Sequence, residues 1–341
     1  MRAGAAADTV TAMSEDRARS DATQRRMETA ALPPFGEERE TVWGADWGAA
    51  TDAGRLRRVL VRAPGSELER IDAAAYDPAA DALVDPEGRW YWLGSEPPDV
   101  GLAHAQHEAL VAALEAEGVT VDRLAPLGDR FAKAMYIRDP LVVLPEGVLV
   151  GRMGVRMRRG EEAAVTAEAA ALGAPVLATV TGDGVLEGGT VLRLAPGLWA
   201  AGTGVRCNAR GFERLRDVLG WMGVELLSVP LPGWSIHLDM HMGVVDSGRV
   251  LARSHELPYD FLETLRARGI EVLDAPAEEP SGVNLLCLRP GRVLMAAGNP
   301  RTEEVLAGAG VEVVTVAYDE LWKNGGGIHC STQELIRDPC D

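Results

Sequence analysis

The chain has 341 residues, of which 47% are apolar, and a formal net charge of −17 at neutral pH. This length allows one large domain or two ordinary ones with a substantial core, and no stretch approaches the roughly 18 apolar residues that cross a bilayer. The acidic balance disfavours nucleic acid or an anionic membrane surface as a partner. It is compatible with a small cationic substrate.

The cysteines are too few and too scattered for a disulfide framework, and they lack zinc-binding spacing: Cys207, Cys287, Cys330 and Cys340. We therefore expect reduced thiols, a cytoplasmic protein and neither a metal nor an organic cofactor. Residues 1–40 contain no apolar segment typical of a secretory signal or an anchor, and they predict a disordered or weakly ordered N-terminal extension. Residues 41–341 are expected to form a single domain.

From Trp43 onward, strand-like runs alternate with helical patterns. Residues 58–62 predict a strand, 101–117 a helix and 119–123 another strand. Further strands are expected at 141–150, 175–181, 190–201, 224–229, 244–252, 270–273, 285–295 and 311–316, and further helices at 161–172, 211–222, 259–268 and 301–308. About five units of roughly 45 to 60 residues are typical of a propeller or an array. A closed ring would place the loops of all five units at one end.

The segment Gly325-Gly326-Gly327-Ile328-His329-Cys330 is the most informative part of the chain. Three glycines let the backbone adopt positive φ and approach a ligand closely. A thiol on such a loop is a candidate nucleophile, whereas a buried structural cysteine is the alternative interpretation.

Three more polar motifs lie beside strand-like runs: Arg138-Asp139-Pro140, Glu187-Gly188-Gly189 and His237-Leu238-Asp239. Together with Cys330 they stand in the order and spacing of the guanidino-group-modifying enzymes, which the chain resembles over residues 43–341. The ending Ile336-Arg337-Asp338-Pro339 is similar to the tail of bacterial arginine deiminases. The resemblance implies an α/β fold, a five-bladed α/β propeller (pentein) of ββαβ repeats, in agreement with the repeat pattern.

The resemblance also implies a role for each motif. Cys330 is expected to be the nucleophile, His237 the general acid and base, and Glu187 the residue that orients His237. Asp139 and Asp239 are expected to pair with guanidinium nitrogens, because forked donors match carboxylates. Residues 41–341 would then be one catalytic domain.

Among the histidines, His237 is favoured because it stands two residues before Asp239. This spacing places both side chains on one face of a strand. We expect His241 and His329 to point elsewhere or to lack an acidic partner.

Arg158 and Arg206 match the positions where relatives hold a substrate carboxylate. They imply an amino-acid substrate instead of a simple amine. An internal salt bridge between Arg138 and Asp139 would compete with the substrate-binding interpretation of Asp139.

The resemblance implies a hydrolase of the guanidino group of arginine or a close derivative, which acts through a covalent thiouronium intermediate and releases ammonia or an amine. A dihydrolase, an amidinotransferase and a non-catalytic guanidino-binding protein are the alternatives. Lys323-Asn324 and Thr190 depart from the arginine deiminase pattern, and Asp239 departs from the dimethylargininase pattern. A homo-oligomer is compatible with the sequence.

Overall fold

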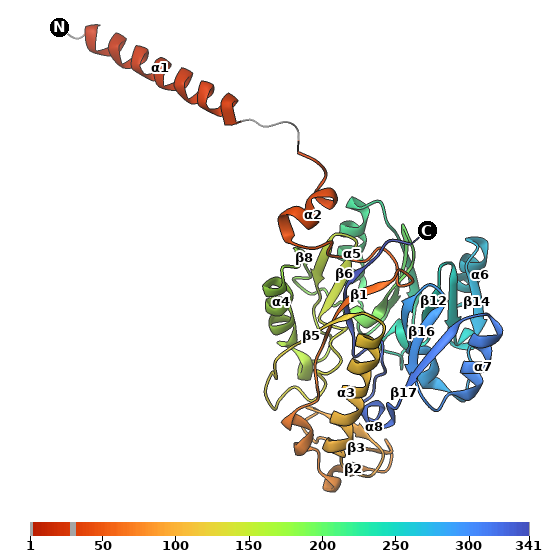
Figure 1. Ribbon diagram of the computed structural model, residues 1–341. Helices are drawn as coiled ribbons and strands as arrows, with labels where there is room; N and C mark the ends of the chain where they lie inside the picture. Colours follow the sequence, from red (N-terminus) through yellow and green to blue (C-terminus); the bar gives the residue numbers. More distant parts are fainter. Residues whose placement is uncertain (1–2, 28–31, 341) are drawn as a thin grey trace.

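The computed structural model describes residues 3–27 and 32–340 (Figure 1). Helix α1 (Ala3–Met27) is followed by α2 (Phe35–Trp43), which ends at Gly44 with a φ of +80°. The described side chains of α1 are exposed. The weak order expected for residues 1–40 stays a prediction, as does the single domain over 41–341. Among the described helices, none has the length and apolar character that a membrane crossing needs.

Four successive units share one plan, in which a hairpin is followed by a helix and by a strand parallel to the hairpin's second strand. The hairpins are β6–β7 (Leu141–Leu144, Gly147–Val150), β9–β10 (Val191–Ala195, Leu198–Thr203), β12–β13 (Met242–Asp246, Arg249–Ala252) and β15–β16 (Leu286–Arg289, Arg292–Ala296). The helices and third strands are α4–β8 (Glu161–Leu172, Val176–Thr179), α5–β11 (Ala209–Trp221, Glu225–Pro230), α6–β14 (Tyr259–Ala267, Glu271–Asp274) and α7–β17 (Pro300–Gly308, Glu312–Val316). The predicted repeat is confirmed.

The fifth unit is assembled from both ends of the ring. Strand β1 (Leu56–Val61) pairs in parallel with β5 (Thr120–Arg123), and α3 (Val100–Ala116) connects them. The first hairpin strand is missing there, and β18 (Gln333–Arg337) from the C-terminal end takes its place, antiparallel to β1. This pairing joins the last unit to the first, so the predicted five-bladed α/β propeller is confirmed.

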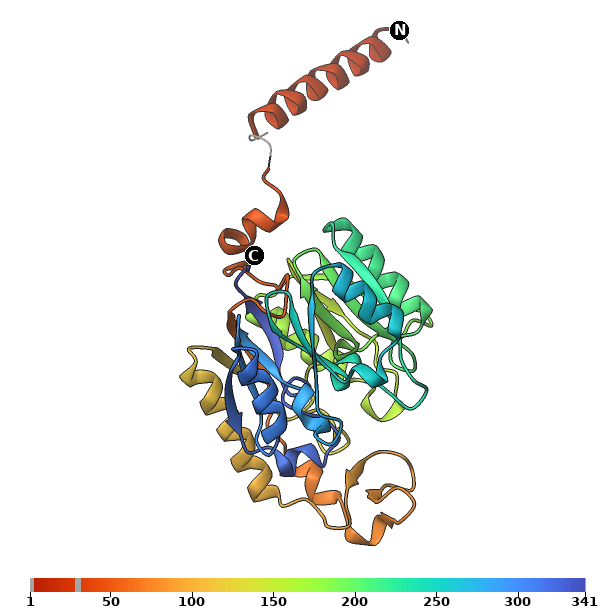
Figure 2. The ribbon, with the colours of Figure 1, turned by 90° about the vertical axis from the view of Figure 1, so that its right-hand side faces the viewer.

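The apolar core fills the spaces between neighbouring sheets. In one such cluster, Leu192 and Leu194 of β9 pack with Val244 of β12, Val250 of β13 and Phe261 of α6. Burying a side chain of this size contributes about 1.5–3 kcal/mol before entropy is counted. Figures 1 and 2 show the strands gathered toward the centre with α3 to α7 outside them.

One small sheet lies outside the repeat. It consists of β2 (Tyr76–Asp77), β3 (Ala82–Val84) and β4 (Tyr91–Leu93), between β1 and α3. The amide of Leu93 donates to the carbonyl of Lys323, just after α8 (Asp319–Trp322), at 2.7 Å. The insertion therefore lies against the segment that leads into the glycines, at the lower end of the molecule in Figures 1 and 2.

Candidate active site

Each of the five units contributes one polar side chain from the segment just before the strand that opens its hairpin. These residues are Asp139 before β6, Glu187 before β9, His237 before β12, Asn284 before β15 and Cys330 before β18. A ring of similar units brings equivalent segments to one end, which is why residues so far apart in sequence meet. Asn284 was not among the predicted site residues, although its position before the opening strand of a repeat could have identified it.

A pocket with about 470 Å³ of empty space, its open mouth included, lies among these segments. Six of the seven predicted site residues line it: Asp139, Arg158, Glu187, Arg206, His237 and Cys330. Asp239 is buried and contacts the Cys330 sulfur at 3.4 Å.

The glycines before Cys330 are required by close contacts as well as by conformation. Gly325 has a φ of +95°, and a Cβ there would collide with the Tyr91 hydroxyl. A Cβ on Gly327 would lie 2.5 Å from Asn284 Oδ1. Side chains at these positions would push the loop away from the pocket, so the glycines fix the place of the thiol.

The surroundings of Cys330 keep its thiol neutral. Burial, followed by the negative charges of Asp239 and Asp139, raises the pKa of Cys330 well above its usual value. Asn284 Nδ2 donates to the sulfur at 3.1 Å, while the thiol donates to Asp239 Oδ2. A positive charge placed in the pocket would therefore favour the thiolate.

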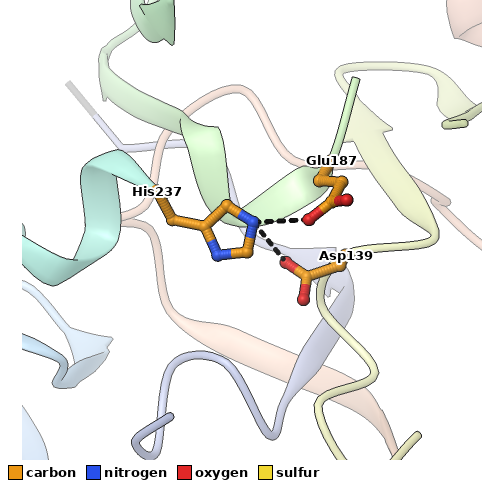
Figure 3. A group of neighbouring side chains, drawn as sticks. All are labelled: Asp139, Glu187 and His237. Atoms are coloured by element: carbon orange, nitrogen blue, oxygen red, sulfur yellow. Dashed lines mark hydrogen bonds and ion pairs between the residues drawn. The ribbon is translucent and has the colours of Figure 1, made fainter. Parts of the chain in front are cut away.

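His237 lies beside two carboxylates, those of Glu187 and Asp139, which stabilise its positive charge (Figure 3). Its Nε2 is 2.7 Å from Glu187 Oε2 and 3.6 Å from Asp139 Oδ1. Burial lowers the pKa of His237, but Asp139 and Glu187 outweigh burial and raise the pKa to about 9. The imidazole is protonated at neutral pH and donates to Glu187.

The expected placement of His237 and Asp239 on one face of a strand is wrong. His237 immediately precedes a 3₁₀ turn, Leu238–Met240, and not a strand, so a two-residue spacing does not place side chains on one face. Asp239 Oδ2 instead lies 2.8 Å from His329 Nδ1. His241 Nδ1 also has an acidic partner, Glu256, at 2.7 Å. The assignment of His237 as acid and base stays a prediction, supported by its place in the pocket.

Arg138 fixes the tautomer of His329. Arg138 Nη2 lies 2.7 Å from His329 Nε2, and a guanidinium can only donate. His329 Nε2 is therefore the acceptor, and Nδ1 carries the hydrogen that is donated to Asp239. Arg138 also forms an ion pair with Glu334 at 3.0 Å. In the described chain its ion pairs are with Glu334 and Asp52, not with Asp139.

The two predicted carboxylate-binding arginines differ in how strongly they are already bound. Arg158 donates to Asp139, to Glu161 at 2.7 Å and to the carbonyl of Tyr136 at 2.8 Å. Arg206 has one long contact, 3.4 Å to Glu187, and its Nε is buried without a partner among the described residues. Arg206 therefore has the greater free hydrogen-bonding capacity.

Tyr91 and Lys133 line the pocket and were not predicted, whereas Asn284 contacts Cys330 without lining the pocket. Tyr91 comes from the β2–β4 insertion, which no sequence pattern predicted. Lys133 donates to the carbonyl of Tyr91 at 2.7 Å and to that of Asn324, and its Nζ lies 3.2 Å from the centre of the Tyr91 ring. A lysine inside the apolar run 131–137 was the signal that could have found it.

The set Asp139, Glu187 and His237 could also hold a metal ion, because their ligand atoms lie within 4.8 Å of one another (Figure 3). The same atoms are engaged in hydrogen bonds. Glu187 Oε1 accepts from the Gly154 amide at 2.6 Å, and Asp139 Oδ1 accepts from Gly189 at 3.1 Å. The arrangement fits a proton-holding group better than an ion site, and the expected lack of a cofactor stays a prediction.

Comparisons with known proteins show the family to which the chain belongs. The arginine deiminase family model matches residues 275–337. An N(G),N(G)-dimethylarginine dimethylaminohydrolase of Streptomyces coelicolor is 32% identical over 279 residues, which cover 82% of this chain and 97% of the relative. Asp239 departs from the dimethylargininase pattern, yet the match extends over almost the whole length of this dimethylargininase.

Solved structures show the same fold. The dimethylargininase of Pseudomonas aeruginosa, a cysteine-to-serine mutant complexed with citrulline, has a TM-score of 0.68 at 23% identity and covers 83% of this chain and 100% of its own. The amidinotransferase SxtG of Microseira wollei has a TM-score of 0.69 at 18% identity, with 87% and 98% covered.

The propeller and its site define an enzyme of the pentein type. The chain belongs to the guanidino-group-modifying superfamily, in the branch that includes the Streptomyces dimethylarginine dimethylaminohydrolase. The predicted superfamily is confirmed, and so is the predicted enzyme class, an arginine deiminase-like hydrolase of C–N bonds in guanidino groups.

Proposed function

We propose that the chain is a cysteine-dependent hydrolase of the guanidino group of arginine or a close derivative. The observation that carries this proposal is one pocket in which the Cys330 thiol, a protonated His237 and the carboxylates of Asp139 and Glu187 converge. A cationic planar group is the ligand that such carboxylates attract. The relatives named dimethylargininase and arginine deiminase support the same substrate class.

In the first half of the reaction the substrate supplies the charge that activates the nucleophile. The guanidinium pairs with Asp139 and Asp239 and offsets the two charges that raise the pKa of Cys330, so the thiol loses its proton to solvent water. The thiolate attacks the central guanidinium carbon. His237 gives its proton to the departing nitrogen, which leaves as ammonia or an amine.

The second half restores the enzyme. The product of the first half is a thiouronium group bound covalently to Cys330. His237, now neutral, takes a proton from water as the water attacks the same carbon. The carbon–sulfur bond then breaks, the thiol reforms and a ureido compound such as citrulline leaves. Glu187, 2.7 Å from His237, holds the imidazole in place through both proton transfers.

Amidinotransfer is the second candidate, because SxtG shares the fold. In that reaction an amine replaces water in the second half. Transferases of the superfamily usually have an aspartate where Glu187 stands, which favours hydrolysis. A dihydrolase differs in converting arginine through to ornithine, and a non-catalytic binding protein would process nothing.

One experiment separates these functions. The protein is incubated with arginine, methylated arginines, agmatine and guanidinoacetate, with and without amine acceptors, and the products are identified by mass. A ureido product together with ammonia or a methylamine supports hydrolysis, and an amidinated acceptor supports transfer. Failure to process every guanidino compound, with no selective labelling of Cys330 by a thiol-reactive probe, would leave only the binding protein.

A further inference from the structure

Lys133 is a buried cation in the pocket wall. Lysine occurs at only two positions in the chain, Lys133 and Lys323, and Lys133 is 4% exposed. Its ammonium group donates to the carbonyls of Tyr91 and Asn324. Within the described residues it forms no ion pair with a carboxylate, whereas Lys323 pairs with Glu320 at 2.6 Å. The two carbonyls accept two of its three hydrogens, and the centre of the Tyr91 ring lies 3.2 Å from Nζ, but none of these groups carries a full negative charge.

The charged groups around the pocket leave this cation uncompensated. The pocket is lined by four basic side chains, Lys133, Arg158, Arg206 and His237, and by two carboxylates, Asp139 and Glu187. Both carboxylates are engaged, Asp139 with Arg158, and Glu187 with His237 and Arg206. Burial, followed by Arg158, lowers the pKa of Lys133 well below its usual value, so its charged form is disfavoured until a negative group binds beside it. A negatively charged group of the substrate would supply the missing counter-charge.

The unpartnered acceptor that an α-ammonium group could use in this wall belongs to the same residue that binds Lys133. Asn324 Oδ1 is buried without a partner and belongs to a pocket-lining residue, so it could accept a hydrogen bond from an ammonium. The main-chain carbonyl of the same Asn324 already accepts from Lys133. Two ammonium groups would then stand within one residue's length of each other in a poorly solvated wall, where like charges repel strongly.

We propose that the preferred substrate is an ω-guanidino acid, which carries a carboxylate but no α-ammonium group, and that Lys133 makes this selection. The inference rests on the proposed function of Cys330 and names the substrate class of that site. The guanidinium occupies the Cys330 end, while the carboxylate is held by Arg206 and Lys133. An amino acid such as arginine brings the same carboxylate together with a cation that the wall repels.

The test compares two substrates that differ only in the α-ammonium group, L-arginine and its deamino analogue. The native chain should use the deamino analogue with a kcat/KM at least about tenfold higher, because one like-charge contact between partly buried groups is removed. Lys133→Gln should reduce the ratio toward one, with a gain for arginine. Lys323→Gln is the matched control, since Lys323 is paired and does not line the pocket, and it should leave the ratio unchanged.

The substrate comparison does not depend on any variant of Lys133. If Lys133→Gln does not fold, the native ratio still decides, and binding of both compounds to the Cys330→Ser chain by calorimetry gives a second measure. Arginine used as well as or better than its deamino analogue overturns the inference and leaves the guanidino hydrolase standing. If neither compound nor any other guanidino compound is processed, the proposed function fails and the inference fails with it.

Discussion

Asp139 and Asp239 are both buried carboxylates near the same thiol, yet their partners differ. Asp139 lines the pocket and is bound by Arg158 and by the amide of Gly189. Asp239 contacts His329 and Cys330 through Oδ2, while its Oδ1 is buried without a hydrogen-bond partner in the part of the chain that is described. Asp139 can be reached from the pocket and is already paired, whereas Asp239 is buried and can still accept a hydrogen bond at Oδ1.

The difference assigns different tasks to the two carboxylates. A guanidinium that enters the pocket must compete with Arg158 for Asp139, but it meets no competitor at Asp239 Oδ1. Both negative charges raise the pKa of Cys330, and Asp239 raises it more than Asp139 does. We therefore expect Asp139, which lines the pocket, to meet the entering cation, and Asp239 to control the thiol and to pair with the cation once it is bound.

The largest effect should come from replacing Cys330, because both carboxylates act on its sulfur. Cys330→Ser should lower kcat by at least roughly a thousandfold, because a serine hydroxyl lacks the nucleophilicity of a thiolate. The melting temperature should change little, since the substitution is close to isosteric. Mass spectrometry of the native enzyme during turnover should show an adduct on Cys330. Retention of more than a few per cent of activity in the variant would exclude the covalent mechanism.

Asparagine at each carboxylate tests the comparison directly. Asp239→Asn and Asp139→Asn should each reduce kcat/KM roughly tenfold to a hundredfold, because each removes a charge-assisted contact worth about 1.5–3 kcal/mol. Both should also lower the pKa of the Cys330 thiol, and Asp239→Asn should lower it more. The rate of thiol alkylation as a function of pH measures this shift.

Citrulline, a neutral ligand, provides the control for the asparagine variants, and its affinity should change less than that of arginine. A structural role for Asp239 would give a different result. Asp239→Asn would then unfold the protein while the activity per folded molecule stayed unchanged.

The pH dependence tests the carboxylates on the histidine side. Asp139 and Glu187 raise the pKa of His237 in the free enzyme to about 9, so the acid form persists below that pH and kcat/KM should fall as pH rises above it. The same raised pKa stabilises the fold: the contribution is complete below the usual value of 6.5 and is lost as pH rises through about 9. Glu187→Gln should move both transitions to lower pH. Rate profiles and denaturant unfolding at several pH values measure them.

Glu256→Gln is the matched control for Glu187→Gln. Glu256 also pairs with a histidine, His241, but neither residue lines the pocket. The rate profile of this variant should keep its position. An unchanged profile in Glu187→Gln as well would show that His237 is not the proton donor.

Most of the fold followed from local patterns, but two parts did not. The helices were predictable from local sequence: α5 and α6 have an apolar face, and α4, which matches the expected helix at 161–172, is rich in the strong helix formers alanine and glutamate. Strand β18 was missed because its partner β1 lies at the other end of the chain, where no local pattern reports it. The β2–β4 insertion was missed because strands of two or three residues carry too little periodicity.

The site divides in the same way. Cys330 and Glu187 could be named from their glycine-containing motifs, because such motifs mark close backbone approach. The relative orientation of His237 and Asp239 could not be predicted, since two side chains at this spacing point in different directions on a 3₁₀ turn and on a strand. Tyr91 and Lys133 reach the pocket only through tertiary packing.

The smallest effect should separate the two arginines that accompany the carboxylates. Arginine should be used better than agmatine, which lacks the carboxylate, by roughly tenfold or more. Arg206→Ala should reduce that preference by lowering kcat/KM for arginine more than for agmatine, because Arg206 is weakly engaged with Glu187.

Arg158→Ala should mainly cost stability, on the order of 3–5 kcal/mol, because it leaves Asp139 and Glu161 buried without their cation. Kinetics with both substrates and denaturant unfolding of each variant measure the two effects. Equal use of agmatine by the native enzyme would move the substrate class to guanidino amines and remove the carboxylate role from Arg206.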